Sequence, residues 1–289
     1  MDAKEIIGIG MQLALITLVA TVGLQSKWRE VVETIRRPAG LLRAIIAVNI
    51  VVPLAAVLLC MAFPIDQSVK IGLIIAAVSP LAPMLTGKLL RTGANASRVV
   101  GYYVVLVLLS VLIVPATIAL LSRLFPADGM ITVGAIAKLV MLSVLAPLAA
   151  GLLVGTVLPG LAARLVKPLT FAGYGLLLLL AIPILYSQFG AIIGLIGNGA
   201  VLAMGLTSIA AVAAGHWLGG PDTHSQTSLA LAAATRHPGM AALIVNANFD
   251  DQRALVAVIL YVIISGIVAG VYLQWAKRRG ARATTALEA

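Results

Sequence analysis

The chain is built from apolar runs of about 20 residues, separated by short joints that carry charge, proline or glycine. A helical run of this length matches the hydrocarbon core of a bilayer, and a helix satisfies its own backbone polar groups in lipid. Hydrophobic residues make up 61% of the sequence and charged residues 10%, against roughly 45–50% and 25% in soluble domains. We therefore predict an all-α polytopic membrane protein with one transmembrane domain over residues 1–289.

Nine transmembrane helices can be drawn from these runs, and no linker between them is long enough to separate domains. The predicted spans are residues 6–24, 41–63, 69–90, 99–121, 139–158, 169–186, 201–218, 228–248 and 254–275. The first five residues lead into the first run without a small-residue cleavage site, which favours a first span over a signal peptide. Residues 26–37 are expected to form a short amphipathic segment or a solvated loop.

The distribution of lysine and arginine predicts the orientation of the chain. Alternate joints are rich in these residues, and cytoplasmic loops carry such an excess. The basic joints hold Lys27, Arg29, Arg36, Arg37, Lys88, Arg91, Arg98, Arg164, Lys167, Lys277, Arg278, Arg279 and Arg282. We therefore expect the N-terminus outside and the C-terminus in the cytoplasm, in an inner or plasma membrane. The net charge of +10 is then explained by the basic residues of the cytoplasmic joints, and nucleic acid is not an expected partner.

Residues 227–249, TSLALAAATRHPGMAALIVNANF, form a span that carries an arginine and a helix break at its middle. An arginine at mid-membrane depth costs roughly 2.5–3.5 kcal/mol on insertion scales. Pro238 lacks a backbone donor and Gly239 loosens the chain, so the helix should break beside Arg236 and His237. Broken backbone is tolerated at this depth only where protein or a water-filled cavity receives it. The stretch is therefore a candidate substrate site of a transporter.

The third span has a related interruption, with Ser79, Pro80 and Pro83 followed by Met84–Lys88. Because the third and eighth spans are five spans apart, they should cross the membrane in opposite directions. Paired interrupted spans in corresponding halves indicate a site between inverted repeats. The predicted fold is thus an inverted-repeat transporter fold with two broken, crossing helices.

At these two breaks the sequence resembles the bile acid:sodium symporter family. The resemblance is carried by residues 79–95 (SPLAPMLTGKLLRTGAN), 111–120 (VLIVPATIAL) and 229–249 (LALAAATRHPGMAALIVNANF). It implies a core domain containing both broken helices that moves against a panel domain, and a nine-span, bacterial-type form of the fold. It also implies a small organic anion as the substrate.

The sequence departs from the family at the positions of its sodium ligands. The family's Ser-Asn pair falls on Leu85-Thr86, and its glutamate and glutamine fall on Ala232 and Arg236. Hydroxyls of the next helix fall on Val99 and Tyr103. No Asp or Glu lies inside a predicted span, so no carboxylate offsets a bound cation at membrane depth. We therefore expect no cofactor, no metal site and sodium sites that are absent or degenerate.

Arg236 is the leading candidate for substrate binding, because a guanidinium can grip a carboxylate, sulfonate or phosphate with two hydrogen bonds. An alternative role is a structural bond to a carbonyl of the broken third span. The other candidate substrate ligands are His237, Thr86, Lys88, Asn49 and Asn246.

The predicted function is a secondary transporter of small organic anions that works by alternating access, with sodium coupling lost or altered. Uniport, anion exchange and proton coupling through His237 are open. A sodium-coupled organic-anion symporter, a carrier of the auxin-efflux type and a non-transporting receptor or assembly protein are the alternatives. An enzyme is not expected, because no nucleophile–base pair or metal cluster occurs at membrane depth. The substrate, the direction of transport and the oligomeric state are not set by the sequence.

Overall fold

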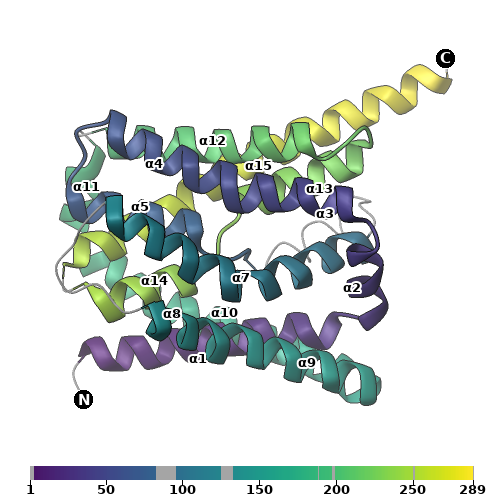
Figure 1. Ribbon diagram of the computed structural model, residues 1–289, viewed down its shortest axis with the longest axis horizontal. Helices are drawn as coiled ribbons and strands as arrows, with labels where there is room; N and C mark the ends of the chain where they lie inside the picture. Colours follow the sequence, from purple (N-terminus) through teal and green to yellow (C-terminus); the bar gives the residue numbers. More distant parts are fainter. Residues whose placement is uncertain are drawn as a thin grey trace.

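The computed structural model describes residues 3–82, 96–124, 133–187, 189–196, 199–249 and 251–288. Within these residues the chain is helical, apart from turns and a single isolated β-bridge. Figure 1 shows the helices running side by side across the molecule, with the two termini at opposite ends. The helices are α1 (Ala3–Gln25), α2 (Trp28–Ile35), α3 (Pro38–Ile45), η1 (Ile46–Val51), α4 (Val52–Ala62), α5 (Gln67–Val78), α7 (Ala96–Leu124), α8 (Val133–Val140), η2 (Met141–Leu145), α9 (Ala146–Val157), α10 (Pro159–Ser187), α11 (Phe189–Ile196), α12 (Ala200–Leu218), α13 (Thr223–Ala234), α14 (Pro238–Asn248) and α15 (Gln252–Glu288).

Seven helices in the described part of the chain are long and apolar enough to cross a membrane. They are Glu5–Gln25, Pro38–Ala62, Gly101–Leu120, Gly134–Val157, Pro159–Ser187, Ala200–Leu218 and Arg253–Arg279. These correspond to seven of the nine predicted spans. The third and eighth predicted spans contain the shorter helices α5, α13 and α14 instead. The prediction of an all-helical, multi-pass membrane protein is therefore confirmed.

Two expected joints are helical in the structure. Residues 26–37 contain α2, which buries Val31 and Thr34 and packs against α7. Residues 159–167, between the fifth and sixth predicted spans, form the first turns of α10. Pro159 is the first residue of that helix, where the missing N–H costs nothing.

Two groups of helices make up the bundle. Helix α1 packs against both α9 and α10, at the lower side of Figure 1. Helices α4, α5, α12, α13, α14 and α15 form the second group, in which α12 lies on α13 and α5 lies on α15. Within the first group the contact of α1 with α9 is close, since a Cβ added to Gly23 would lie 2.4 Å from the Leu148 carbonyl oxygen.

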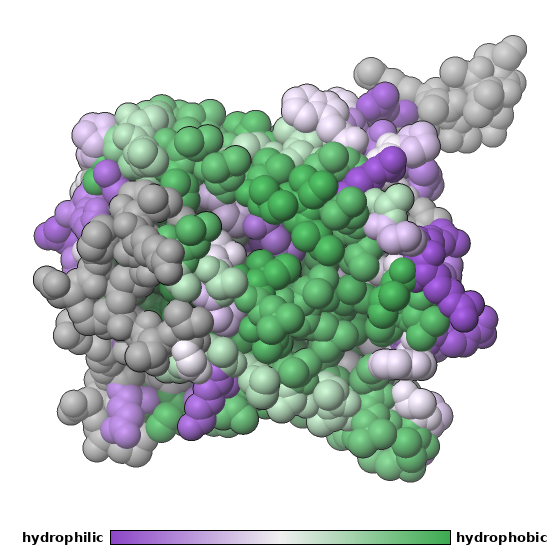
Figure 2. All heavy atoms as spheres, viewed as in Figure 1, coloured by the Kyte–Doolittle hydropathy of each residue, from purple (hydrophilic) through white to green (hydrophobic). Residues whose placement is uncertain are grey.

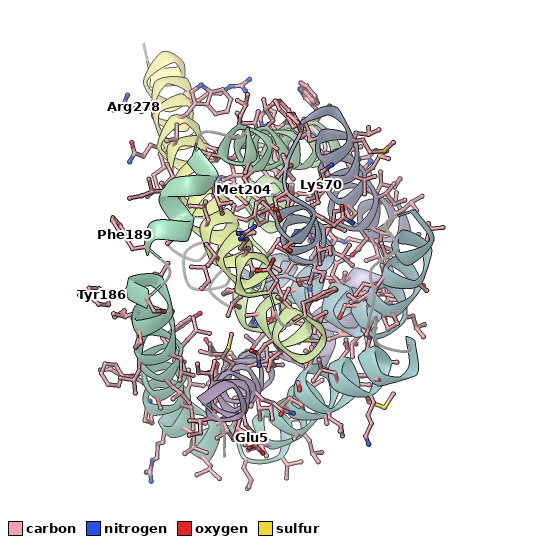
Figure 3. All side chains as sticks on the ribbon, turned by 90° about the vertical axis from the view of Figure 1, so that its left-hand side faces the viewer. Glu5, Lys70, Tyr186, Phe189, Met204 and Arg278 are labelled. Atoms are coloured by element: carbon pink, nitrogen blue, oxygen red, sulfur yellow. The ribbon has the colours of Figure 1, made fainter. Side chains whose placement is uncertain are left out.

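The outer surface suits a lipid environment. Figure 2 shows apolar side chains over the middle of the face in view, with hydrophilic ones mainly toward its two sides. Helix α10 is the most outward-facing of the long helices, and its Phe171 and Tyr186 are 81% and 86% exposed. In Figure 3 the side chains of Tyr186 and Phe189 point away from the bundle.

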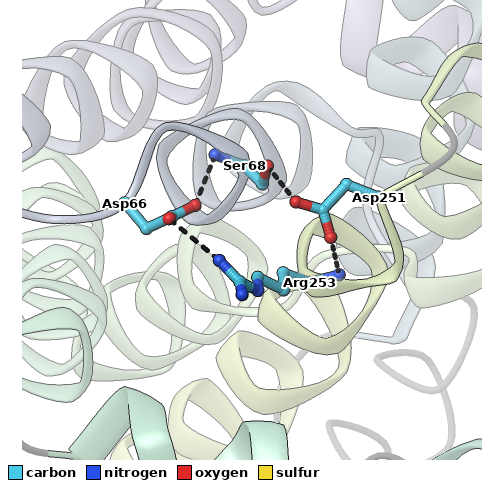
Figure 4. A network of polar contacts seen from close by, with 4 residues as sticks. All are labelled: Asp66, Ser68, Asp251 and Arg253. Atoms are coloured by element: carbon cyan, nitrogen blue, oxygen red, sulfur yellow. Dashed lines mark hydrogen bonds and ion pairs between the residues drawn. The ribbon is translucent and has the colours of Figure 1, made fainter.

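A polar network fixes the start of α5 to the start of α15 (Figure 4). Asp66 caps α5 by accepting a 2.9 Å hydrogen bond from the Ser68 N–H, and it also accepts a 3.2 Å bond from the Arg253 guanidinium. The Ser68 hydroxyl donates to Asp251 at 2.5 Å. The first half of the broken third span is thereby anchored to the last helix.

Candidate functional site

The two predicted breaks lie next to each other in the structure. Helix α5 ends at Val78 and α13 ends at Ala234, and both chains continue in extended conformation. Leu81 and Arg236 form an antiparallel bridge, and the His237 N–H donates to the Pro80 carbonyl at 2.8 Å. Figure 1 shows the link between α13 and α14 passing through the middle of the bundle. The two breaks therefore satisfy part of each other's backbone, as membrane depth requires.

Arg236 joins these breaks to a third segment. Its side chain is 2% exposed. One terminal nitrogen, Nη1, donates to the Ser79 carbonyl at 3.2 Å, and the other, Nη2, donates to the Val48 carbonyl at 2.6 Å. The guanidinium therefore makes the structural bond that was the alternative to substrate binding. The role of Arg236 as a substrate ligand stays a prediction.

The Val48 carbonyl is available because of the local helix geometry. Val48 lies in η1, a π-helical segment in which a carbonyl pairs with the N–H five residues later. Five residues after Val48 comes Pro53, which has no N–H. The hydrogen-bond acceptor that the helix leaves without a donor is the one that the guanidinium uses.

The guanidinium has no acidic neighbour among the described residues. Their acidic side chains belong to joints and to the ends of helices, and none lies along the middle of a membrane helix. The Tyr261 hydroxyl of α15 lies beside the guanidinium. The site therefore carries a buried positive charge that polar atoms solvate and that no described carboxylate neutralises.

His237 follows Arg236 and caps the start of α14. It is 1% exposed, and neither of its ring nitrogens has a hydrogen-bond partner. The ring lies over Gly239, since a Cβ added there would be 3.4 Å from His237 Cε1 and 3.6 Å from a methyl group of Leu177 on α10. The first turn of α14 thus faces α10 of the first helix group, and the His237 ring, which has no hydrogen-bond partner, lies beside it.

The remaining candidates are placed as follows. Asn49 is adjacent to Val48, and its amide nitrogen is buried without a partner. Asn246 lies near Gly8 of α1, since a Cβ on that glycine would be 3.3 Å from its amide nitrogen. Along α14 it is about 13 Å from His237 at 1.5 Å per residue, so the structure does not bring it to the breaks. Thr86, Lys88 and Pro83 lie outside the described residues.

Two contributors to the site were not predicted from the sequence. The Val48 carbonyl had a signal, which is the proline five residues later. Tyr261 had none, because it is one apolar-helix tyrosine among several. The Tyr103 hydroxyl on α7 has no partner, and it faces Tyr174 of α10 closely enough for an electrostatic interaction.

The fold and the paired breaks are those of a multi-pass membrane transporter. The chain belongs to the Sodium Bile acid symporter family, whose sequence profile matches residues 12–214. The predicted family is confirmed, and the members' transport function makes an enzyme unexpected. No curated protein matches the chain. The matched region contains the first break and ends within α12, before the break that holds Arg236.

Proposed function

We propose that the protein is a secondary transporter of small organic anions that works by alternating access, with sodium coupling lost or altered. The proposal includes nine membrane crossings, arranged as inverted repeats whose third and eighth members are the broken spans. It rests on membership of the family and on the meeting of the two breaks inside the bundle. The observation that carries it is the buried Arg236 guanidinium between these breaks.

The preference for an anion follows from electrostatics. A unit charge about 6 Å from an opposite one gains about 3 kcal/mol at an effective dielectric constant of about 20. The N-terminus of α14 adds the N–H groups of Gly239 and Met240, which no preceding turn can satisfy, and the positive end of the helix dipole. The His237 ring adds a polar group with no partner in the protein. An anionic substrate between α14 and α10 would meet all three.

Sodium does not fit the described part of this site. Carbonyls of Ser79 and Val48 are already engaged by a cationic side chain, and a second cation there would meet its charge without a carboxylate to offset it. We therefore propose uniport or anion exchange, or proton coupling through His237, in place of sodium symport.

The proposed orientation puts the N-terminus outside and the C-terminus in the cytoplasm of an inner or plasma membrane. The two ends of the described chain lie at opposite ends of the helices. The basic residues after α1 and at the end of α15 lie together at the proposed inner end, as the positive-inside rule requires.

The test is uptake by proteoliposomes of labelled carboxylates and sulfonates, with sodium chloride replaced by choline chloride in parallel. We expect saturable uptake of at least one anion at equal rates in the two salts. Strict sodium dependence would refute the coupling proposal. Absence of uptake by correctly inserted protein, for every anion tried, would favour a receptor or assembly role.

The same assay tests the Arg236 substrate role. Arg236→Ala should abolish uptake even by the protein that inserts and folds, because the site loses its positive charge. Arg278→Ala is the matched control, since it removes an exposed arginine far along α15. Full transport by Arg236→Ala would refute a substrate or coupling role for this residue.

A further inference from the structure

We propose that Arg236 is a built-in cation that holds three chain segments together, and that removing its side chain opens a site for a free guanidinium ion. The segments are η1, the break after α5 and the break after α13. This inference deepens the proposed function, because it identifies what takes the place of a coupling ion. Its transport consequence rests on that function, whereas its binding consequence does not.

The geometry around the guanidinium is that of a coordinated cation. Main-chain carbonyls of Val48 and Ser79 point at it from two different segments, at 2.6 Å and 3.2 Å. Each carbonyl accepts one hydrogen bond from a different terminal nitrogen, so the two acceptors are spaced for a planar guanidinium.

The carbonyls are held in place without the arginine. The His237 N–H bonds to Pro80 and the backbone of residue 236 bridges to Leu81, so main-chain contacts alone keep the breaks side by side. The Ser79 hydroxyl donates a 2.8 Å hydrogen bond to the Ile75 carbonyl. The hydroxyl is therefore engaged within its own helix, and the Ser79 group that faces the site is the main-chain carbonyl. Val48 is fixed by the π-helical turn before Pro53.

Truncation of Arg236 should therefore leave an acceptor-lined cavity at a buried point. Acceptors left without donors inside a protein are costly, so a guanidinium ion that can reach the cavity should be bound, because it has the shape and the donors of the missing group. Two carbonyls without a carboxylate do not replace the hydration shell of sodium or potassium, so these ions should not be bound. The native chain should not bind guanidinium, because its own side chain fills the position.

The experiment measures the melting temperature of purified Arg236→Ala in chloride salts of choline, sodium, potassium and guanidinium at equal ionic strength. Guanidinium is kept at millimolar concentrations, well below those that denature. A ligand that binds only the folded state raises its melting temperature. We expect guanidinium, and neither sodium nor potassium, to raise the melting temperature of Arg236→Ala by several degrees relative to choline.

The unmodified protein and Arg278→Ala are the controls, and for each of them the melting temperature should be the same in all four salts. Identical melting of Arg236→Ala in all four salts would overturn the proposal, as would equal guanidinium stabilisation of the controls. If Arg236→Ala does not fold, the series is run on Arg236→Gln. If neither Arg236→Ala nor Arg236→Gln folds in choline chloride, the proposal requires that guanidinium chloride restores folded protein. Failure to restore it would overturn the proposal.

This readout is separate from transport. Guanidinium-dependent melting of Arg236→Ala would support the built-in cation even if no transported anion were found. Guanidinium-independent melting alongside measured anion uptake would refute the built-in cation and leave the proposed function standing.

Discussion

Gly215 of α12 sets the position of the broken eighth span. A Cβ added at this glycine would lie 2.4 Å from Ala230 Cα, 2.4 Å from the Leu229 carbonyl oxygen and 2.5 Å from the Ala230 nitrogen. All three are backbone atoms of α13, so no side-chain rotation relieves the overlap. Gly215→Ala should therefore push α12 and α13 apart by about 1 Å, toward ordinary contact distances of about 3.5 Å.

The magnitude follows from a matched comparison on the same helix. Gly205 is also in α12, and a Cβ there meets nothing within 4 Å. Both substitutions gain helix propensity, about 1 kcal/mol, so this gain cancels between them. The remaining difference is the overpacking cost of about 1–3 kcal/mol. Arg236 lies six residues after Ala230. A shift of α13 by about 1 Å would therefore move the bonds from its guanidinium to the two carbonyls beyond the usual 3.2 Å limit of such hydrogen bonds.

The assay is thermal unfolding of both variants and the unmodified protein in one detergent, followed by anion uptake. We expect Gly205→Ala to melt at or above the original temperature and Gly215→Ala several degrees below it, with reduced uptake. Equal melting temperatures for the two variants would refute the idea that close backbone contact through Gly215 positions the break.

Two further perturbations test other contacts. Pro53→Ala supplies an N–H that competes with Arg236 for the Val48 carbonyl, so anion uptake should fall several-fold. Pro147→Ala, which follows the second π-helical segment, is the control and should not change uptake. Similar uptake by the two variants would contradict this role of Pro53. At the start of α15, burial raises the pKa of Asp251, but the hydrogen bond from Ser68 and the N–H and charge of Arg253 outweigh it and hold the pKa below its ordinary value. The ionised Asp251 carboxylate therefore stabilises the folded state above about pH 4, and this stabilisation is lost as the pH falls below that value. Ser68→Ala removes part of it, so below about pH 4 the melting temperature of this variant should fall less steeply than that of the unmodified protein. Identical pH profiles would contradict that contribution.

The local features of the fold were predictable from sequence, because they depend on residues next to one another. The break at Arg236 and Pro238 and the break at Ser79 and Pro80 follow from missing N–H groups, and the lengths of the apolar runs follow from the bilayer. The helical start of α10 at Pro159 was not predicted, since proline at the first position of a helix and proline between helices look alike.

What sequence reasoning could not reach is the pairing of distant groups. The guanidinium of Arg236 bonds to a carbonyl 188 residues away, and no periodicity relates these positions. The choice between a substrate ligand and a structural contact depends on where that side chain points. Likewise, Gly215 matters only because α13 returns against it, which is a consequence of the folded arrangement.

The pairing of Arg236 with Pro53 has a consequence for redesign of such bundles. Arg236 has a free acceptor at membrane depth because Pro53, which is distant from it in the sequence, has no N–H to donate to the Val48 carbonyl. A graft of the arginine alone into another helical membrane protein would place a charge among carbonyls already in use. The residue that makes the charge tolerable carries no charge itself, and the two must be transplanted together.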